Sequence, residues 1–115
     1  MRFRSQQAAI PHITPAELMA GLGSDTPPLL LDFRGDAHIA RTGPIDGATQ
    51  ARLDDLPQAV SHWPKHRHIV TMCACPEDAT AVRAARNLTK LGYTSVRPLK
   101  GGYESWIRHA GQHRP

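Results

Sequence analysis

The chain has 115 residues, a length that fits one compact domain with a single modest core. Its formal net charge is +4, but the basic residues are scattered and aromatic residues make up only 5% of the chain, so we expect no nucleic-acid binding. The two cysteines are separated by one residue, a spacing that strains a structural disulfide, and we therefore expect free thiols.

No part of the sequence indicates export or insertion into a membrane. The first residues, 1–5, are followed by no apolar run long enough for a secretion signal, and no stretch approaches the length of a membrane-spanning helix. Free thiols also fit a reducing compartment. We therefore expect a cytoplasmic protein that does not insert into the membrane directly.

The first third of the chain contains signals for a helix, a strand and a further helical turn. Thr14 before Pro15, with Glu17 at the third helical position, predicts the capped start of a short helix. The apolar run Leu29–Leu31 is short enough for a buried strand. Residues 36–40 fit one helical turn, followed by glycine and proline turn chemistry.

The middle of the chain continues this alternation and leads to the first cysteine. Apolar residues from Leu53 to Trp63 have helical spacing. The β-branched segment over residues 69–72 then predicts a second buried strand, which ends directly at Cys73.

The last third contains the strongest helix signal. A helix is predicted from Pro76 to Lys90, with two acids in its first turn and a glycine after its end. A third strand over residues 94–99 and a last helix around Trp106 follow. The residues expected to share the sheet-facing side of the long helix are Val82, Ala85, Leu88 and Leu91.

Strands that alternate with helices at this spacing predict an α/β fold with a central, mostly parallel sheet flanked by helices on both faces. We expect the domain to span residues 13–111, with a flexible arm over 1–12 and a C-terminal tail over 112–115. Such sheets bind ligands at the carboxyl ends of their strands, where the sequence places Cys73.

Cys73 is a candidate nucleophile because of its position between a strand and a helix. Backbone N–H groups at a helix start are unpaired within the helix, and they lower the pKa of a neighbouring thiol. A thiolate there can attack sulfur, peroxide or a phosphate ester. The alternative is a buried, inert cysteine, which is common in strands.

Four segments together resemble the rhodanese-like domains, which carry sulfane sulfur on a cysteine in a strand-to-helix loop. Each segment alone is weak, but their order and spacing around the cysteine are specific. The segments are Leu31-Asp32-Phe33-Arg34, Ile45-Asp46-Gly47-Ala48, Val70-Thr71-Met72-Cys73, and the stretch from Leu91 through Gly101-Gly102 to Trp106.

The resemblance implies a sulfurtransferase in which Cys73 carries the sulfur as a persulfide. It also implies that Asp32 and Arg34 support the loop, and that no cofactor or metal is needed. The backbone amides of residues 74–79 would cradle the sulfur, except at Pro76, which has no N–H. The substrate-binding residues on this basis are Ala74, Cys75, Glu77, Asp78 and Ala79.

The loop departs from the pattern of thiosulfate-using members in its charge. It contains Glu77 and Asp78 and no basic residue, so we expect thiosulfate to be a poor donor. A small persulfide or a protein persulfide is the favoured donor and a thiol the acceptor. We expect a monomer, and the alternative that the chain is a soluble part of a membrane protein stays open.

Other functions stay open beside sulfur transfer. The same pocket could belong to a non-catalytic regulatory or binding module, or Cys73 and Cys75 could form a thiol redox switch. Cys75 is either a resolving thiol or a packing residue. Phosphatase activity is disfavoured, because Ala79 stands where a phosphate-binding arginine is needed. The histidines at 62, 66 and 68 start the strand that ends at Cys73, so a shared metal site is disfavoured too.

Overall fold

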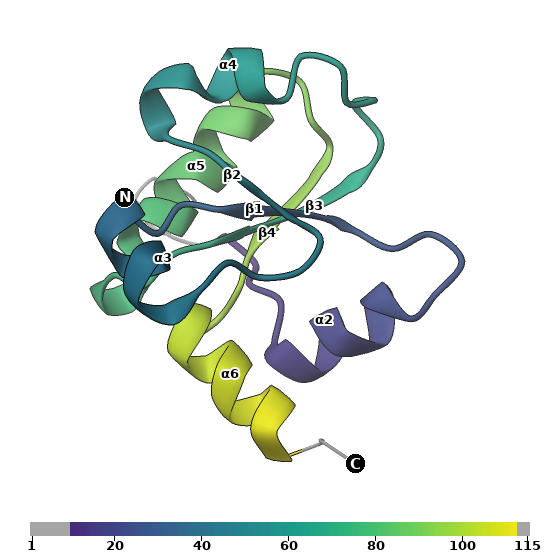
Figure 1. Cartoon of the computed structure of the whole chain (residues 1–115). Coiled ribbons are helices and arrows are strands. Elements are labelled where there is room, and N and C mark those ends of the chain that lie inside the picture. Colours follow the sequence, from purple (N-terminus) through teal and green to yellow (C-terminus); the bar gives the residue numbers. More distant parts are fainter. Residues whose placement is uncertain (1–9, 113–115) are drawn as a thin grey trace, which may run out of the picture.

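The computed structural model describes residues 10–112. Its centre is a parallel sheet of four strands in the order β2-β1-β3-β4 (Figure 1). The strands are β1 (Leu29–Asp32), β2 (Ala48–Gln50), β3 (His68–Met72) and β4 (Ser95–Pro98). This arrangement confirms the α/β prediction and brings the carboxyl ends of the strands to one edge of the sheet.

Helices cover both faces of the sheet. Figure 1 shows α4 and α5 on one side and α2 and α6 on the other. The helices are α2 (Pro15–Leu22), α3 (Asp36–Thr42), α4 (Leu56–Ala59), α5 (Ala79–Lys90) and α6 (Gly102–Gln112), with 3₁₀ turns η1 (Leu53–Asp55) and η2 (Pro76–Asp78).

Two hydrophobic clusters form the core, one on each face of the sheet. Side chains of a strand point alternately to the two faces, so Ile69 belongs to one cluster while Val70 and Met72 belong to the other. Cys73 continues this alternation on the side of Ile69, within the cluster that contains the buried residues of α5. The sheet periodicity therefore points the first cysteine into the core.

The start of α2 is as predicted. The Glu17 backbone N–H donates to Thr14 Oγ1 at 3.1 Å, and Glu17 Oε1 accepts from the Thr14 backbone N–H at 2.9 Å. Each side chain thus satisfies a backbone donor that the first turn leaves free.

The long helix begins three residues later than predicted. Glu77 and Asp78 have φ angles of 56° and 58°, in the left-handed region that an α-helix cannot use. They follow Pro76 in the short turn η2, and α5 starts at Ala79. The Asp78 carboxylate accepts a hydrogen bond from the Gly101 N–H at 3.0 Å. This tertiary contact helps to hold the break, which local signals around Pro76 do not reveal.

The sheet-facing side of α5 also differs from the prediction. Its buried residues are Ala81, Ala84, Ala85 and Leu88. Val82 is half-buried, and Leu91 is 38% exposed. The buried positions follow the i, i+3, i+4, i+7 spacing from Ala81, and three of them are alanines, so the contact with the sheet is made largely by small side chains.

The middle segment has less helix and one more strand than predicted. The predicted helix from Leu53 to Trp63 is reduced to η1 and the four-residue α4. The additional strand, β2, has three residues and lies at the edge of the sheet, where it carries no apolar alternation that would reveal it.

Part of the predicted N-terminal arm contacts the domain. Residues 1–9 lie outside the described residues, as do residues 113–115 of the predicted tail. Ile10 packs against the core, the Arg97 guanidinium donates to the His12 carbonyl, and Ile13 pairs with Leu99. The described chain therefore lies against β4 before α2 begins.

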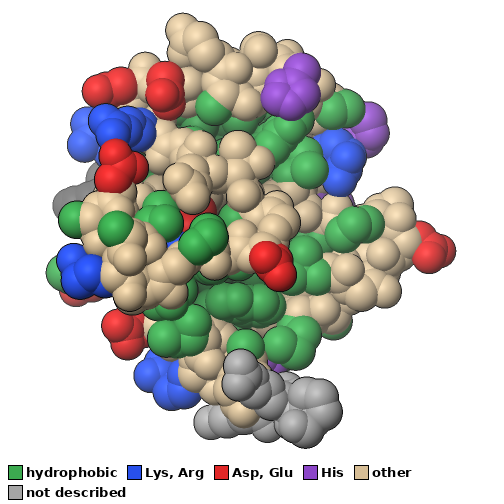
Figure 2. All heavy atoms as spheres, in the orientation of Figure 1, with side chains coloured by type: hydrophobic (Ala, Val, Ile, Leu, Met, Phe, Trp, Pro, Cys, Tyr) green, Lys and Arg blue, Asp and Glu red, His purple; other side chains and the backbone are tan. Residues whose placement is uncertain are grey.

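The surface shows scattered charge. On the described part of the face drawn in Figure 2, Lys and Arg side chains are spread around the rim and form no continuous patch. No helix within residues 10–112 is both long and apolar enough to cross a membrane.

Candidate functional site

The candidate site lies at the carboxyl ends of β1 and β3, the two central strands. β1 pairs with β2 on one side and with β3 on the other, so the chain leaves the middle of the sheet in two directions at this edge. Ligands of open parallel sheets bind where connections diverge in this way. The loop after β3, residues 73–78, contains both cysteines.

The Asp32 and Arg34 side chains form a buried ion pair at this edge. The Arg34 Nη2 donates to Asp32 Oδ2 at 2.8 Å, and its Nε contacts both carboxylate oxygens at 3.0 Å. The guanidinium also donates to Thr42 Oγ1 and to the Gly43 carbonyl, and it lies 4.1 Å from the centre of the Tyr103 ring. The Asp32 and Arg34 side chains are therefore bonded to one another and to the surrounding fold.

The support that this pair gives to the cysteine loop is indirect. Tyr103 packs on Arg34, and the Tyr103 backbone N–H donates to the Cys73 carbonyl at 3.0 Å. The neighbouring Gly102 lies so close that a Cβ there would overlap the same carbonyl oxygen. Arg34, Tyr103 and Gly102 thus fix the first residue of the loop against the start of α6.

The Cys73 side chain is fully buried. It is 0% exposed and belongs to the core cluster. Burial raises the pKa of the Cys73 thiol, and a hydrogen bond to the Cys75 side chain raises it further, while the backbone N–H groups of Cys75 and Ala81 offset only part of this effect. The predicted lowering of the Cys73 pKa is therefore wrong, because desolvation outweighs the neighbouring amides.

The Cys75 side chain is half-buried, and its pKa shifts in the opposite direction to that of Cys73. Its Sγ lies 3.1 Å from Thr80 Oγ1. Burial and the nearby Asp78 carboxylate raise the pKa of Cys75, but hydrogen bonds from the Thr80 hydroxyl, the Cys73 side chain and the Thr80 backbone N–H lower it, and the net direction is downward.

The amides that act on the sulfurs overlap the predicted set only in part, because the Cys75 N–H acts on Cys73. The backbone N–H of Asp78 donates to the Cys75 carbonyl and that of Ala79 to the Pro76 carbonyl, so both are used inside the turn. The N–H groups that reach a sulfur include those of Thr80 and Ala81, in the first turn of α5. The late start of α5 explains this shift along the chain.

The two acids of the loop have different environments. Glu77 is exposed, whereas Asp78 is 9% exposed and bonds to the Gly101 N–H. His12 Nε2 lies 3.8 Å from the Asp78 carboxylate. Asp78 is therefore used to hold the loop against the α6 side, while Glu77 and the exposed Ala74 face solvent.

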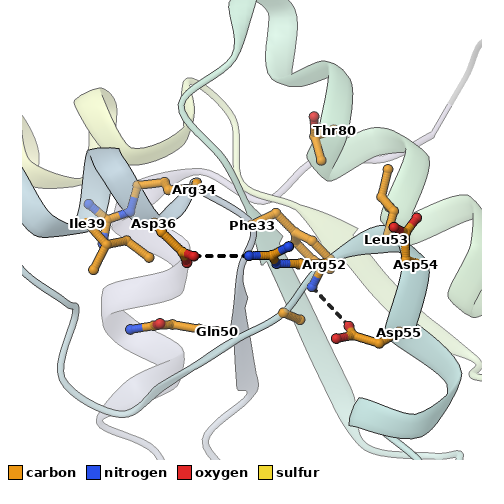
Figure 3. Close-up of a pocket in the computed structure, with 12 residues that line it drawn as sticks. Phe33, Arg34, Asp36, Ile39, Gln50, Arg52, Leu53, Asp54, Asp55 and Thr80 are labelled. Carbon is orange, nitrogen blue, oxygen red and sulfur yellow. Dashed lines mark hydrogen bonds and ion pairs between the residues drawn. The ribbon is translucent and has the colours of Figure 1, made fainter.

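A cavity of about 430 Å³ opens at this edge of the sheet, and no residue of the loop 73–78 lines it. Its wall comes from the segments after β1 and β2 and, on α5, from Thr80. Figure 3 shows the Arg52 guanidinium directed at the Asp36 carboxylate, and their closest atoms are 3.0 Å apart. The lining residues are Phe33, Arg34, Gly35, Asp36, Ile39, Gln50, Ala51, Arg52, Leu53, Asp54, Asp55 and Thr80.

Comparison with known proteins identifies the family. The family model described as Rhodanese-like domain matches residues 14–109. The chain belongs to the rhodanese-like domain family. A protein of Allochromatium vinosum named Sulfurtransferase is 37% identical over 81 residues, which is 70% of this chain and 73% of the relative. The family and this relative support a sulfurtransferase at the level of the family.

Solved structures agree on the fold. A rhodanese-like domain protein from Staphylococcus aureus superposes with a TM-score of 0.72 at 24% identity, covering 84% of this chain and 91% of the other. The Alr3790 protein from Anabaena sp. gives the same TM-score at 28% identity, covering 84% and 77% of the two chains. The rhodanese-like sheet and its helices are thus shared with proteins of distant sequence.

The histidines do not join the thiols of this rhodanese-like domain in a metal site. Within residues 10–112, no group of three or more His, Cys, Asp or Glu side chains is placed to hold a metal ion. His68 begins β3, at the end of the strand away from Cys73.

Sequence reasoning missed three contributors to this rhodanese-like site. Thr80 was not singled out, because a threonine in an alanine-rich helix start gives no signal of its own. Arg52 and Asp36 come from segments far apart in the sequence and meet only through the fold.

Proposed function

We propose that the protein is a sulfurtransferase that carries sulfane sulfur as a cysteine persulfide in the loop after β3. The observation that carries this proposal is the pair of free thiols in the loop between β3 and α5, at the carboxyl edge of a rhodanese-like sheet. The sequence predicts Cys73 as the carrier, and that assignment stays a prediction. Cys75 is the chain's other thiol.

The proposed reaction has two steps. A thiolate of the loop attacks the outer sulfur of a donor, the donor's sulfur–sulfur bond breaks, and the donor leaves as a thiolate with the bonding electrons. The resulting persulfide is then attacked at its outer sulfur by an acceptor thiolate, which releases the cysteine thiolate. Backbone N–H groups that point at the sulfur stabilise its negative charge without a cofactor.

The charge around the site favours a persulfide over thiosulfate as the donor. Asp78 stands close enough to Cys75 to raise its pKa. The cavity wall contains three aspartates and two arginines. The charge of one arginine, Arg34, is already neutralised by Asp32 outside the wall. A doubly charged anion meets net negative charge here, and like charges disfavour its approach.

The test is a steady-state transfer assay with a small persulfide and with thiosulfate as alternative donors and a small thiol as acceptor. We expect turnover with the persulfide and little with thiosulfate, and no turnover in the variant with both cysteines changed to serine. A Michaelis constant for thiosulfate in the micromolar range contradicts the donor preference. Equal turnover in the double variant contradicts the sulfurtransferase proposal itself.

A second candidate is a thiol redox switch, and it is favoured by the two free thiols that stand one residue apart in the same loop. In this reaction a peroxide oxidises one thiolate to a sulfenate, and the other thiol displaces hydroxide to form a disulfide. Because only one residue separates the cysteines, that ring is strained. Loss of both titratable thiols after one equivalent of peroxide, reversed by a dithiol, supports the switch.

A further inference from the structure

Asp78 stands directly before α5, at the position where an aspartate side chain usually caps a helix. A capping aspartate has an extended backbone, and its carboxylate accepts a hydrogen bond from an N–H group of the first turn. Asp78 has neither property, because its φ is 58° and its ψ is 31°, and its side chain makes no capping hydrogen bond. One of the residue types best suited to cap a helix therefore leaves this helix start uncapped.

The Asp78 carboxylate binds the segment before α6 instead. Its Oδ2 accepts the Gly101 N–H at 3.0 Å, and its Oδ1 lies 3.4 Å from the place that a Cβ on Gly102 would take. His12 Nε2 approaches the same carboxylate at 3.8 Å. Asp78 is buried among these groups, so its side chain is held away from the helix that it precedes.

The same short segment also holds the other end of the cysteine loop. The Tyr103 N–H donates to the Cys73 carbonyl at 3.0 Å. Residues 101–103 thus bind both the first residue of the loop 73–78 and the last. The path of the loop, and with it the direction of the Asp78 side chain, is therefore set by the start of α6.

This arrangement leaves the first N–H groups of α5 to the two sulfurs. Burial raises the pKa of the Cys73 thiol, and the Ala81 N–H is one of the groups that act against this rise. Burial also raises the pKa of the Cys75 thiol, and the Thr80 N–H is among the groups that lower it. Thr80 and Ala81 are the second and third residues of α5, which are the positions whose N–H groups a capping side chain accepts. A carboxylate that capped α5 would therefore compete with the sulfurs.

We infer that Asp78 is a positioning residue for sulfur transfer: its bond to Gly101 keeps its carboxylate away from α5 and leaves the Ala81 N–H to a persulfide on Cys73. The inference rests on the proposed sulfurtransferase function and on Cys73 as the carrier that the sequence predicts. A buried persulfide anion needs hydrogen-bond donors to offset the loss of water. An uncapped helix start supplies such donors, since its first N–H groups have no partner within the helix.

Glu77 provides a matched comparison for Asp78. The two residues carry the same charge and have the same left-handed backbone, with φ angles of 56° and 58°, but the Glu77 side chain is exposed. Glycine adopts this backbone without strain. Glu77→Gly and Asp78→Gly therefore relieve the same strain and remove one carboxylate each, while only Asp78→Gly loses the bond to Gly101.

The test measures how fast each variant gains sulfur from cysteine persulfide over a series of pH values, by intact-protein mass spectrometry. We expect Asp78→Gly to load about tenfold more slowly than the wild type, the size expected for a lost hydrogen bond to a charged group. Its pH profile should move to higher pH, because the Ala81 N–H no longer stabilises the Cys73 thiolate. Loss of a negative charge by itself favours a thiolate, so the profile of Glu77→Gly should move to lower pH.

Asp78→Asn separates the hydrogen bond from the charge. Its side-chain oxygen can still accept the Gly101 N–H, so we expect it to load at least as fast as the wild type. Slow loading of a folded Asp78→Asn, equal to that of Asp78→Gly, overturns the inference. A shift of Asp78→Gly to lower pH, as in Glu77→Gly, also overturns it, because charge alone then explains the result. Thermal unfolding verifies that each variant is folded.

An amide spectrum of the wild type tests the same inference without a substitution. On loading with cysteine persulfide, we expect the ¹H–¹⁵N signal of Ala81 to move and that of Gly101 to stay in place. A loaded protein in which the Ala81 signal does not move contradicts the inference and leaves sulfur transfer intact. If the wild type gains no sulfur from cysteine persulfide or thiosulfate, the proposed function fails, and the inference fails with it.

Discussion

Two pairs of an aspartate and an arginine lie at the same end of the sheet, and they differ in burial. The side chains of Asp32 and Arg34 are 1% and 0% exposed, whereas those of Asp36 and Arg52 are 80% and 69% exposed. The first pair joins β1 to the segment before β2 and to α6. The second pair lies at the wall of the cavity.

The two cysteines repeat this contrast within one loop. Cys73 is buried and its carbonyl accepts the Tyr103 N–H, while Cys75 is half-buried and contacts the cavity residue Thr80. In each case the same chemistry occurs twice, and the buried copy is bound into the fold. Of the two arginines, Arg52 is therefore the one whose charge is open to a substrate in the cavity.

The largest expected effect is on stability. Arg34→Met leaves the Asp32 carboxylate buried without its cation, and removal of one partner from a buried pair costs roughly 3–5 kcal/mol. Arg52→Met removes an exposed pair, for which we expect a loss of at most about 1 kcal/mol. Urea unfolding of both variants measures the difference. Equal losses contradict the distinction between the two pairs.

The next effect concerns the approach of Gly102 to Cys73. Gly102 has φ +57°, and a Cβ there overlaps the Cys73 carbonyl, whereas Gly47 has φ +81° and open space around it. Gly47→Ala adds only backbone strain of about 1–2 kcal/mol. Gly102→Ala adds the same strain and displaces the loop, so we expect a larger loss in urea unfolding and slower sulfur loading. Similar stability and similar sulfur loading in both variants contradict the conclusion that Gly102 holds the Cys73 carbonyl in place.

The third effect concerns the pH dependence of Cys75. The Thr80 hydroxyl lowers the pKa of the Cys75 thiol, so the thiolate persists to lower pH than an ordinary thiolate. Thr80→Ala raises that pKa, and at neutral pH the smaller thiolate fraction slows alkylation, by roughly threefold to tenfold for a change of up to one pKa unit. Thr80→Ser keeps the hydroxyl and is the matched control. An unchanged alkylation rate in Thr80→Ala contradicts the conclusion that the Thr80 hydroxyl lowers the pKa of Cys75.

The smallest effect is expected at the cavity wall. Arg52 lines the cavity, and its carboxylate partner Asp36 is exposed. Arg52→Ala therefore increases the net negative charge of the cavity wall. We expect the Michaelis constant for an anionic donor to rise about twofold to fivefold with little change in kcat, since a rim charge acts mainly on approach. Asp36→Asn is the control of opposite sign, and it should lower the same constant. A shift in the same direction for both variants contradicts an electrostatic effect.

The fold could be predicted wherever local signals and burial agree. The capping box at Thr14, the apolar run of β1 and the strand that ends at Cys73 depend on neighbouring residues alone, and the structure confirms them. The break before α5 could not be predicted, because it involves a contact between Asp78 and the distant Gly101. The edge strand β2 has too few apolar residues to give a signal.

The site could be predicted only in part, because it too depends on contacts between residues far apart in the sequence. The sequence located the thiol-bearing loop but not the burial of each thiol, although the alternation along β3 already directs the side chain after Met72 toward the helix α5. Thr80 and the cavity were missed, since three segments must come together before the cavity exists.

The most direct test of the account locates the added sulfur in the wild-type protein. After loading with cysteine persulfide, the persulfide is trapped by alkylation and the peptide that contains both cysteines is fragmented in a tandem mass spectrometer. Cleavage between the two cysteines separates their masses. We predict the extra sulfur on Cys73, the thiol that directly follows β3, and an extra sulfur found on Cys75 contradicts the account.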